Sequence, residues 1–177
     1  MRFNIFLLFL LSLLSREGLS VPNRAYVTNM GSNTVSVIDT TTNSVIQTIA
    51  VGNGPAGIAI TPNGRSAYVA NNADNSVSVI DTEANTVIAT IPNIPTAFFI
   101  AITPNGDFAY VTEIFSDYIA VINTQTNQIA QTIPTTHPKG MAITPNGQFA
   151  YVANGDLDVV SVIDTTTNTV INPPITT

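Results

Sequence analysis

An internal repeat of about 42 residues is the feature that most constrains what this chain can fold into. Four tyrosines mark it at spacings of 42, 42 and 41 residues: Tyr26, Tyr68, Tyr110 and Tyr151. Thr-Pro-Asn-Gly recurs with the same period at 61–64, 103–106 and 144–147. Ile-Asp-Thr recurs at 38–40, 80–82 and 163–165, with Ile-Asn-Thr at 122–124. Three independent markers agree on one period, which indicates a repeat architecture.

Each repeat contains four short apolar segments and shows no helical periodicity. In the second copy these segments are 57–61, 67–70, 76–80 and 86–91. Pro62-Asn63-Gly64 has the composition of a tight turn, and residues 81–85 offer short polar side chains that bond to nearby backbone N–H groups. Short strands joined by such turns predict an antiparallel meander. Apolar residues on both strand faces predict sheets stacked face to face, as in propeller blades.

We therefore expect an all-β fold: a β-propeller of four-stranded antiparallel blades, about four in number, without helices beyond a signal peptide. The blades are expected at about 24–50, 56–91, 98–133 and 139–172. The first copy begins at its second strand, and we expect Pro173-Pro174 to end the last strand at 169–172, because prolines suit a strand edge and not an interior. Four arrangements remain open: a small four-bladed ring, an open arc, half of an assembled ring, and a truncated longer propeller. An open arc would expose blade faces, so we expect a homodimer or another association that completes the propeller.

Residues 26–29 read Tyr-Val-Thr-Asn, and related tetrapeptides stand at 68–71, 110–113 and 151–154. Together with the surrounding Pro-x-Gly-Ile-Ala-Ile-Thr-Pro-Asn-Gly and Val-Ser-Val-Ile-Asp-Thr blocks, they resemble the YVTN family of β-propeller repeats over about 24–172. The resemblance implies a bacterial or archaeal surface or extracytoplasmic protein, usually with seven blades. The chain is also similar to propellers of lactonases and of haem- or quinone-linked dehydrogenases, but the residues on which those activities depend are not found.

Residues 1–20 have the composition of a signal peptide, which leaves residues 21–177 as the propeller domain. Arg2 supplies the positive charge, an apolar run follows from Ile5 to Leu14, and Gly18 and Ser20 are small residues before a cleavage point. The run is shorter than the roughly 20 residues of a membrane-spanning helix, although an uncleaved anchor is the alternative. We expect a secreted or extracytoplasmic protein, at the cell surface or in the periplasm, with no membrane span after cleavage.

Charge and cysteine content exclude several classes of partner and cofactor. Only 9% of the residues are charged, against about 25% in typical proteins. The net charge is -6 with five basic residues, so no basic patch is available for nucleic acid. The chain has no cysteine, which excludes disulfides, iron–sulfur clusters and thiolate zinc sites.

No residue pattern predicts catalysis, a cofactor or a metal site. Residues 52–57 fit the dinucleotide pattern G-x-G-x-x-G, but a strand-like segment follows in place of a helix, so we interpret them as a turn between blades. His137 is the sole histidine and builds neither a triad nor a histidine-rich metal site. Asp156 and Asp158 lack the further oxygen ligands of a calcium loop. The aspartates that recur at one repeat position are expected to be turn residues: Asp39, Asp81 and Asp164.

Alternate turns of a meander fall on opposite edges of a blade. The Thr-Pro-Asn-Gly and Asp-Thr turns define a repeated edge, nearly identical in every copy. The loops between second and third strands and the loops between blades define a variable edge, where loops on a rigid scaffold commonly carry function. Aromatic and charged residues gather there, and such clusters suit recognition. The candidate binding residues are Phe98, Phe99, Glu113, Phe115, Asp117, Tyr118, His137, Lys139, Asp156 and Asp158.

The sequence thus predicts a non-catalytic, extracytoplasmic β-propeller that binds a protein or glycan partner or serves as a cell-surface scaffold. One alternative is a propeller related to lactonases or dehydrogenases that acts within a larger assembly, and another is a truncated fragment of a longer propeller. For the three phenylalanines of the variable edge, Phe98, Phe99 and Phe115, the alternative interpretation is that they fill gaps between blades.

Overall fold

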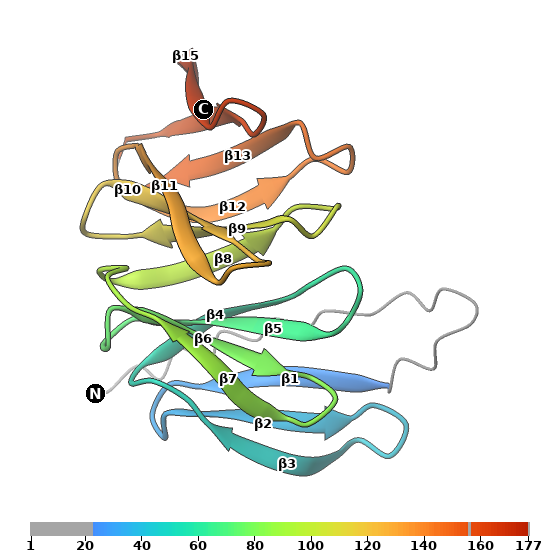
Figure 1. Cartoon of the computed structure of the whole chain (residues 1–177). Helices are drawn as coiled ribbons and strands as arrows, with labels where there is room; N and C mark the ends of the chain where they lie inside the picture. The colour runs from blue at the N-terminus through green and yellow to red at the C-terminus, as the bar shows by residue number, and fades with distance from the viewer. Residues whose placement is uncertain (1–22, 156, 177) are drawn as a thin grey trace.

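The computed structural model describes residues 23–155 and 157–176, which form fifteen β-strands (Figure 1). The strands are β1 (Arg24–Asn29), β2 (Thr34–Asp39), β3 (Ser44–Ala50), β4 (Pro55–Ile60), β5 (Ser66–Asn71), β6 (Ser76–Asp81), β7 (Thr86–Ile91), β8 (Ala97–Ile102), β9 (Phe108–Glu113), β10 (Tyr118–Asn123), β11 (Gln128–Pro134), β12 (Pro138–Ile143), β13 (Phe149–Asn154), β14 (Val159–Asp164) and β15 (Thr169–Thr176). The predicted signal peptide and Asp156 lie outside the described residues.

The strands form four antiparallel meanders, which we call blades 1 to 4. Blade 1 is the three-stranded sheet β1–β3, and the four-stranded sheets β4–β7, β8–β11 and β12–β15 are blades 2, 3 and 4. The first strands of blades 2, 3 and 4 pack against one another on the inner side of the stack, and the last strand of each lies on the outer side. The predicted all-β propeller architecture is confirmed.

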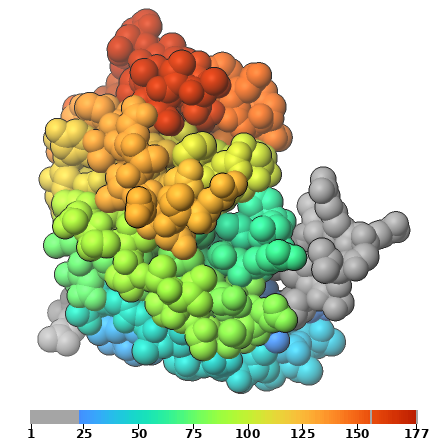
Figure 2. Space-filling model, in the orientation of Figure 1, coloured from blue at the N-terminus to red at the C-terminus, as the bar shows by residue number. Residues whose placement is uncertain are grey.

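The described blades form an open arc. Figure 1 shows blade 1 at one end of the stack and blade 4 at the other, with blades 2 and 3 between them. The space-filling view in Figure 2 shows the same order, from blue to red, with the fourth blade forming the upper end of the molecule. Among the arrangements that the sequence leaves open, a closed four-bladed ring is therefore not what this single chain forms.

Turn chemistry explains why the meanders follow the repeat. In the Thr-Pro-Asn-Gly turns the glycines have positive φ, at 73°, 82° and 73° for Gly64, Gly106 and Gly147, a conformation that side chains disfavour. In the next turn the Asp81 carboxylate accepts the backbone N–H groups of Glu83 at 2.8 Å and Ala84 at 2.9 Å. Asp39 and Asp164 accept the equivalent pairs of N–H groups. The predicted structural role of these aspartates is confirmed.

The glycine-rich segment at 52–57 leads into β4, so the interpretation as a turn between blades is confirmed. The strand begins at Pro55, two residues earlier than the sequence suggests. Pro55 pairs with Asn71, and the register then shifts before Ile58 pairs with Val69. Such a bulge admits a proline without the loss of a regular ladder bond.

The expectation that the last strand ends before Pro173 is wrong. Strand β15 continues to Thr176, and Ile175 pairs with Val160 of β14. Two conditions allow the two prolines inside it. The strand lies at the edge of its sheet, and the register shifts between Val160 and Val162, so that the prolines fall in the irregular segment.

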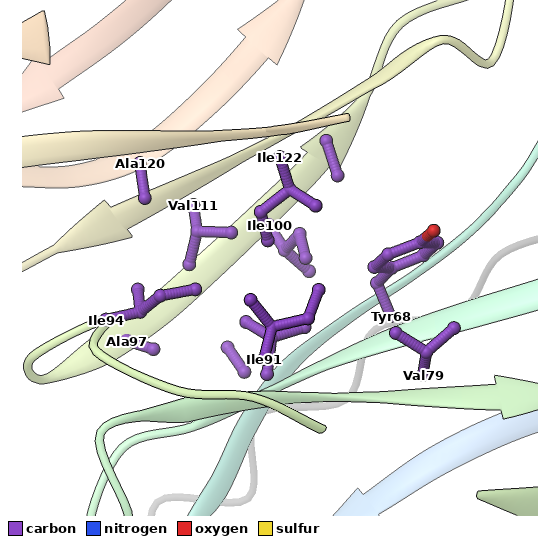
Figure 3. Packing of buried hydrophobic residues seen from close by; sticks show 12 residues of the cluster. Tyr68, Val79, Ile91, Ile94, Ala97, Ile100, Val111, Ala120 and Ile122 are labelled. Carbon is purple, nitrogen blue, oxygen red and sulfur yellow. The ribbon is translucent and has the colours of Figure 1, made fainter. Parts of the chain in front are cut away.

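The hydrophobic core consists of three clusters, each between two consecutive blades. In the cluster between blades 2 and 3, Figure 3 shows Tyr68, Val79 and Ile91 facing Ile100, Val111 and Ile122. These side chains are at most 4% exposed. The clusters between blades 1 and 2 and between blades 3 and 4 repeat this arrangement around Tyr26 and Tyr110. Burial of apolar area between sheets is therefore the main force that holds the blades together.

A polar contact accompanies each cluster, and we call it the Tyr–Asn contact. The hydroxyl of Tyr68 lies 3.2 Å from the backbone oxygen of Thr124 and 2.6 Å from the side-chain amide of Asn127 in the next blade. The Tyr68 hydroxyl donates to the Oδ1 atom of Asn127, and the Thr124 carbonyl oxygen is a second, more distant acceptor. Tyr26 makes the same contact with Thr82 and Asn85, and Tyr110 with Thr165 and Asn168. Burial raises the pKa of Tyr68 to about 12, so its hydroxyl keeps its proton.

Candidate binding edge

The structure places the two kinds of turn on opposite edges of the blades, as predicted. On the repeated edge, the backbone N–H of Thr82 donates to Arg65 O at 3.1 Å, which joins the two repeated turns of blade 2. On the variable edge, the N–H of Asn72 donates to Gly54 O at 2.9 Å, which joins the inter-blade loop to the loop between β5 and β6. The candidate binding residues that the structure describes therefore share one edge of the molecule.

A side-chain link ties each variable loop to the segment that enters the next blade. Asp117 Oδ1 accepts the backbone N–H of His137 at 2.8 Å. Asn75 accepts the N–H of Thr96 and Asn33 accepts that of Gly54, both at 2.9 Å. Two of the candidate residues, Asp117 and His137, are thus brought together by a contact that recurs in three copies, which is the mark of a structural role. The recurrence of Asn or Asp at one repeat position was the sequence signal for it.

Phe115 does not fill a gap between blades. Its side chain is 79% exposed at the tip of the loop between β9 and β10. The backbone beneath it is fixed, since the Phe115 N–H donates to Thr96 Oγ1 at 3.2 Å. Tyr118, at the start of β10, is 44% exposed. The exposed side chains of these two residues are available for a partner.

Phe98 and Phe99 have a different environment from Phe115. Both are half-buried at the start of β8. Phe99 packs against the cluster between blades 3 and 4 that contains Tyr110 and Met141. Phe99 therefore fills space between blades. Phe98, on the same strand, is only partly accessible.

Glu113 is buried where the other copies have asparagine. Asn71, at the equivalent position of blade 2, donates to the hydroxyls of Ser76 and Ser78 at 3.1 and 2.9 Å. The matching positions beside Glu113 are Tyr118 and Ala120, which do not supply the two serine hydroxyls. Glu113 is 4% exposed, and burial raises the pKa of its carboxyl to about 7. Sequence reasoning placed Glu113 on the binding edge but missed that it is buried.

Among the described candidate residues of blade 4, Lys139 and Asp158 are exposed at its variable edge. The side chain of Lys139 passes over the backbone of Gly155, where an added Cβ would stand 2.1 Å from Cε. Gly155 thus leaves room for the lysine, and a larger residue would displace it. His137 is half-buried and has a positive φ of 44°.

Two shallow pockets lie on the repeated edge, which the sequence reasoning did not select. One of about 320 Å³ lies between blades 3 and 4, and one of about 230 Å³ lies between blades 2 and 3. Hydroxyl and amide groups of Thr103, Asn105 and Asn146 line the first, beside the ring of Phe108. Within 23–155 and 157–176, no group of three or more His, Cys, Asp or Glu residues is placed to hold a metal. The same ranges contain no helix that is long and apolar enough to cross a membrane.

Comparison with protein families matches residues 22–170 to the family described as "Lactonase, 7-bladed beta-propeller". Among curated proteins, a 37-residue stretch is 65% identical to the PE-PGRS family protein PE_PGRS18 of Mycobacterium tuberculosis. That stretch covers 21% of this chain and 8% of the relative. The similarity to this relative is therefore confined to one stretch of the chain.

Solved structures share the fold over most of the chain. Hydrazine synthase of Kuenenia stuttgartiensis is 27% identical with a TM-score of 0.80, and the match covers 89% of this chain and 48% of that one. A functionally unknown protein from Desulfotomaculum acetoxidans is 24% identical with a TM-score of 0.77, over 88% and 53% of the two chains. Dihydro-heme d1 dehydrogenase NirN is 18% identical with a TM-score of 0.70, over 87% and 36%. This chain spans about half, or less, of the length of these proteins.

Proposed function

The chain belongs to the lactonase family of seven-bladed β-propellers, and from this premise we propose that it is a non-catalytic binding or scaffold segment of an extracytoplasmic propeller. The partner is a protein or a glycan, and the binding surface is the variable edge of blades 3 and 4. The YVTN resemblance of residues 24–172 supports a surface-type propeller, and the composition of residues 1–20 supports export.

The exposure of Phe115 is the observation that carries this proposal. Contact between water and an aromatic side chain that is 79% exposed is unfavourable. A partner that covers the side chain gains the free energy of removing it from water. Its loop is held by the bond to Thr96 and by the link from Asp117 to His137, so little conformational entropy is lost on binding. Exposed aromatics on rigid loops are typical centres of binding energy.

The test uses a phage-displayed random peptide library and a glycan array as probes. Peptides or glycans selected on the wild-type chain should lose binding to Phe115→Ala and Tyr118→Ala, with dissociation constants about tenfold or more higher. Ile88→Ala is the matched control, because Ile88 is also exposed, at 57%, but lies on the outer strand β7. Equal binding by all three variants would refute the variable edge as the binding surface.

The family match favours a second candidate, a lactonase-type segment that acts within a larger assembly. The test is hydrolysis of γ- and δ-lactones by the purified chain. A pH-stat titration monitors the acid released, and heat-denatured protein is the control. Turnover above that control would replace the binding proposal with the enzymatic one. We expect none.

A further inference from the structure

The Tyr–Asn contact occurs at all three interfaces between blades, so it defines how one blade of this type recognises the next. Each contact joins a tyrosine of one blade to a carbonyl and an asparagine amide in the turn of the following blade. Apolar side chains around it are buried from both sides. We call the tyrosine and the apolar face around it the tyrosine half of the contact. The turn that supplies the carbonyl and the asparagine is the turn half.

The fourth tyrosine half is open at the end of blade 4. Tyr151 is 41% exposed, whereas Tyr26, Tyr68 and Tyr110 are at most 5% exposed. Ile175 on the same face is 48% exposed, although Ile91 and Ile133, its equivalents in blades 2 and 3, are 3% and 1% exposed. Blade 4 therefore presents an apolar face with a hydroxyl group at the position where its neighbours make the contact.

The matching turn half is open at the end of blade 1. Asn43 is exposed, whereas Asn85 is 7% exposed within its contact. Its φ of 51° matches the 52° of Asn85 and the 54° of Asn127, so the turn already has the conformation of the covered copies. Val27 and Ile38, on the side of blade 1 that faces away from blade 2, are half-buried, but their equivalents Val69 and Ile80 are fully buried.

We propose that blade 4 of one copy binds blade 1 of a second copy head to tail, as consecutive blades of one chain bind each other. The Tyr151 hydroxyl hydrogen-bonds to the Asn43 side-chain amide and to Thr40 O of the second copy, while Ile175 and Val162 pack on its Val27 and Ile38. A second copy is the occupant because each chain carries both halves of one self-complementary contact. The proposal does not rest on the proposed binding function, since it concerns the blade faces and not the variable edge.

Two copies joined in this way make two identical interfaces and close a ring of eight sheets. Head-to-tail contacts give rings when the rotation closes, and eight blades lie within the range of about four to eight that propellers form.

The test is the solution mass of the purified full chain by light scattering and analytical ultracentrifugation, from low to high micromolar concentration. We expect twice the chain mass of 18.7 kDa. Tyr151→Ala and Asn43→Ala should each raise the dissociation constant by about tenfold or more, because every dimer loses both contacts. Ile88→Ala, at a comparably exposed site on the outer strand of blade 2, should leave the dimer unchanged.

A mixture of the two variants distinguishes head-to-tail from face-to-face association. A pair of one Tyr151→Ala chain and one Asn43→Ala chain keeps one intact contact, so the mixture should associate more tightly than either variant alone. Thermal melts check that each variant is folded, since both positions are exposed in the single chain. A wild-type monomer at every concentration, or a dimer that neither substitution weakens, would overturn the proposal.

Discussion

Blades 2 and 4 contain the same tetrapeptide, Tyr-Val-Ala-Asn, at 68–71 and 151–154, yet the two tyrosines have different environments. Tyr68 is 1% exposed and contacts blade 3, while Tyr151 is 41% exposed. The strands and the pairing register around them are equivalent. The difference shows that the neighbouring blade, and not the local sequence, determines how much each repeat residue contributes to stability.

The largest expected effect separates these two tyrosines. Tyr68→Ala should lower the free energy of unfolding by about 3–5 kcal/mol, because it leaves a cavity in the cluster between blades 2 and 3 and removes the hydroxyl contact. Tyr151→Ala should cost less than about 1 kcal/mol in the monomer. Urea denaturation at protein concentrations below self-association measures both values. Equal losses would show that the exposed tyrosine is already covered in solution.

A second prediction compares the asparagine position in blade 2 with its glutamate counterpart in blade 3. The folded-state pKa of Glu113, about 7, lies above its ordinary value of 4.5. The neutral carboxyl therefore favours the folded state at low pH, and stability is lost as the pH rises from about 4.5 to about 7 and stays lost above. Glu113→Gln should remove this loss and raise stability at pH 8 by about 1–3 kcal/mol.

The measurement is urea denaturation of both proteins between pH 4 and 8, and the difference between the two profiles isolates Glu113. Glu83→Gln, at an exposed turn position, controls for the change in net charge and should leave the profile close to that of the wild type. If the free energy of unfolding of Glu113→Gln changed with pH in the same way as that of the wild type, the carboxyl would have to be hydrated in the folded protein.

A third prediction compares the stabilities of Asn85→Ala and Asn43→Ala, which alter the turn half of the contact in blades 2 and 1. Both have positive φ, 52° and 51°, so replacement by alanine carries the same backbone strain at each site. Asn85→Ala also removes the amide that lies 2.7 Å from the Tyr26 hydroxyl. It should therefore be less stable than Asn43→Ala by about 1 kcal/mol. Thermal melts of the two variants give this difference directly, and its absence would assign Asn85 to the turn alone.

The smallest effect is expected at Phe115. Because its side chain is 79% exposed, Phe115→Ala should change the free energy of unfolding by no more than about 0.5 kcal/mol. Phe99→Ala should cost clearly more, since Phe99 packs against the cluster between blades 3 and 4. Urea denaturation of the pair tests whether the two aromatics differ in role as they differ in burial.

Local chemistry explains which parts of the fold could be predicted from the sequence. The Thr-Pro-Asn-Gly and Asp-Thr turns depend on residues a few positions apart, and the meander then fixes which loops share an edge. The loss of the two serine hydroxyls beside Glu113 depends on Tyr118 and Ala120 in the paired strand, and the continuation of β15 past Pro173 depends on a bulge opposite β14. Such dependence joins paired strands of one blade, so the local chemistry of the turns does not predict it.

The links from Asp117 to His137 and from Tyr68 to Asn127 join only blades that are consecutive along the chain. A chain built in this way behaves as a one-dimensional array with nearest-neighbour coupling. Each blade stabilises the adjacent blades and does not contact the others. Duplication or loss of one whole unit of about 42 residues therefore preserves every remaining interface. Genes for such proteins can change length by whole blades while each step still encodes a chain that folds.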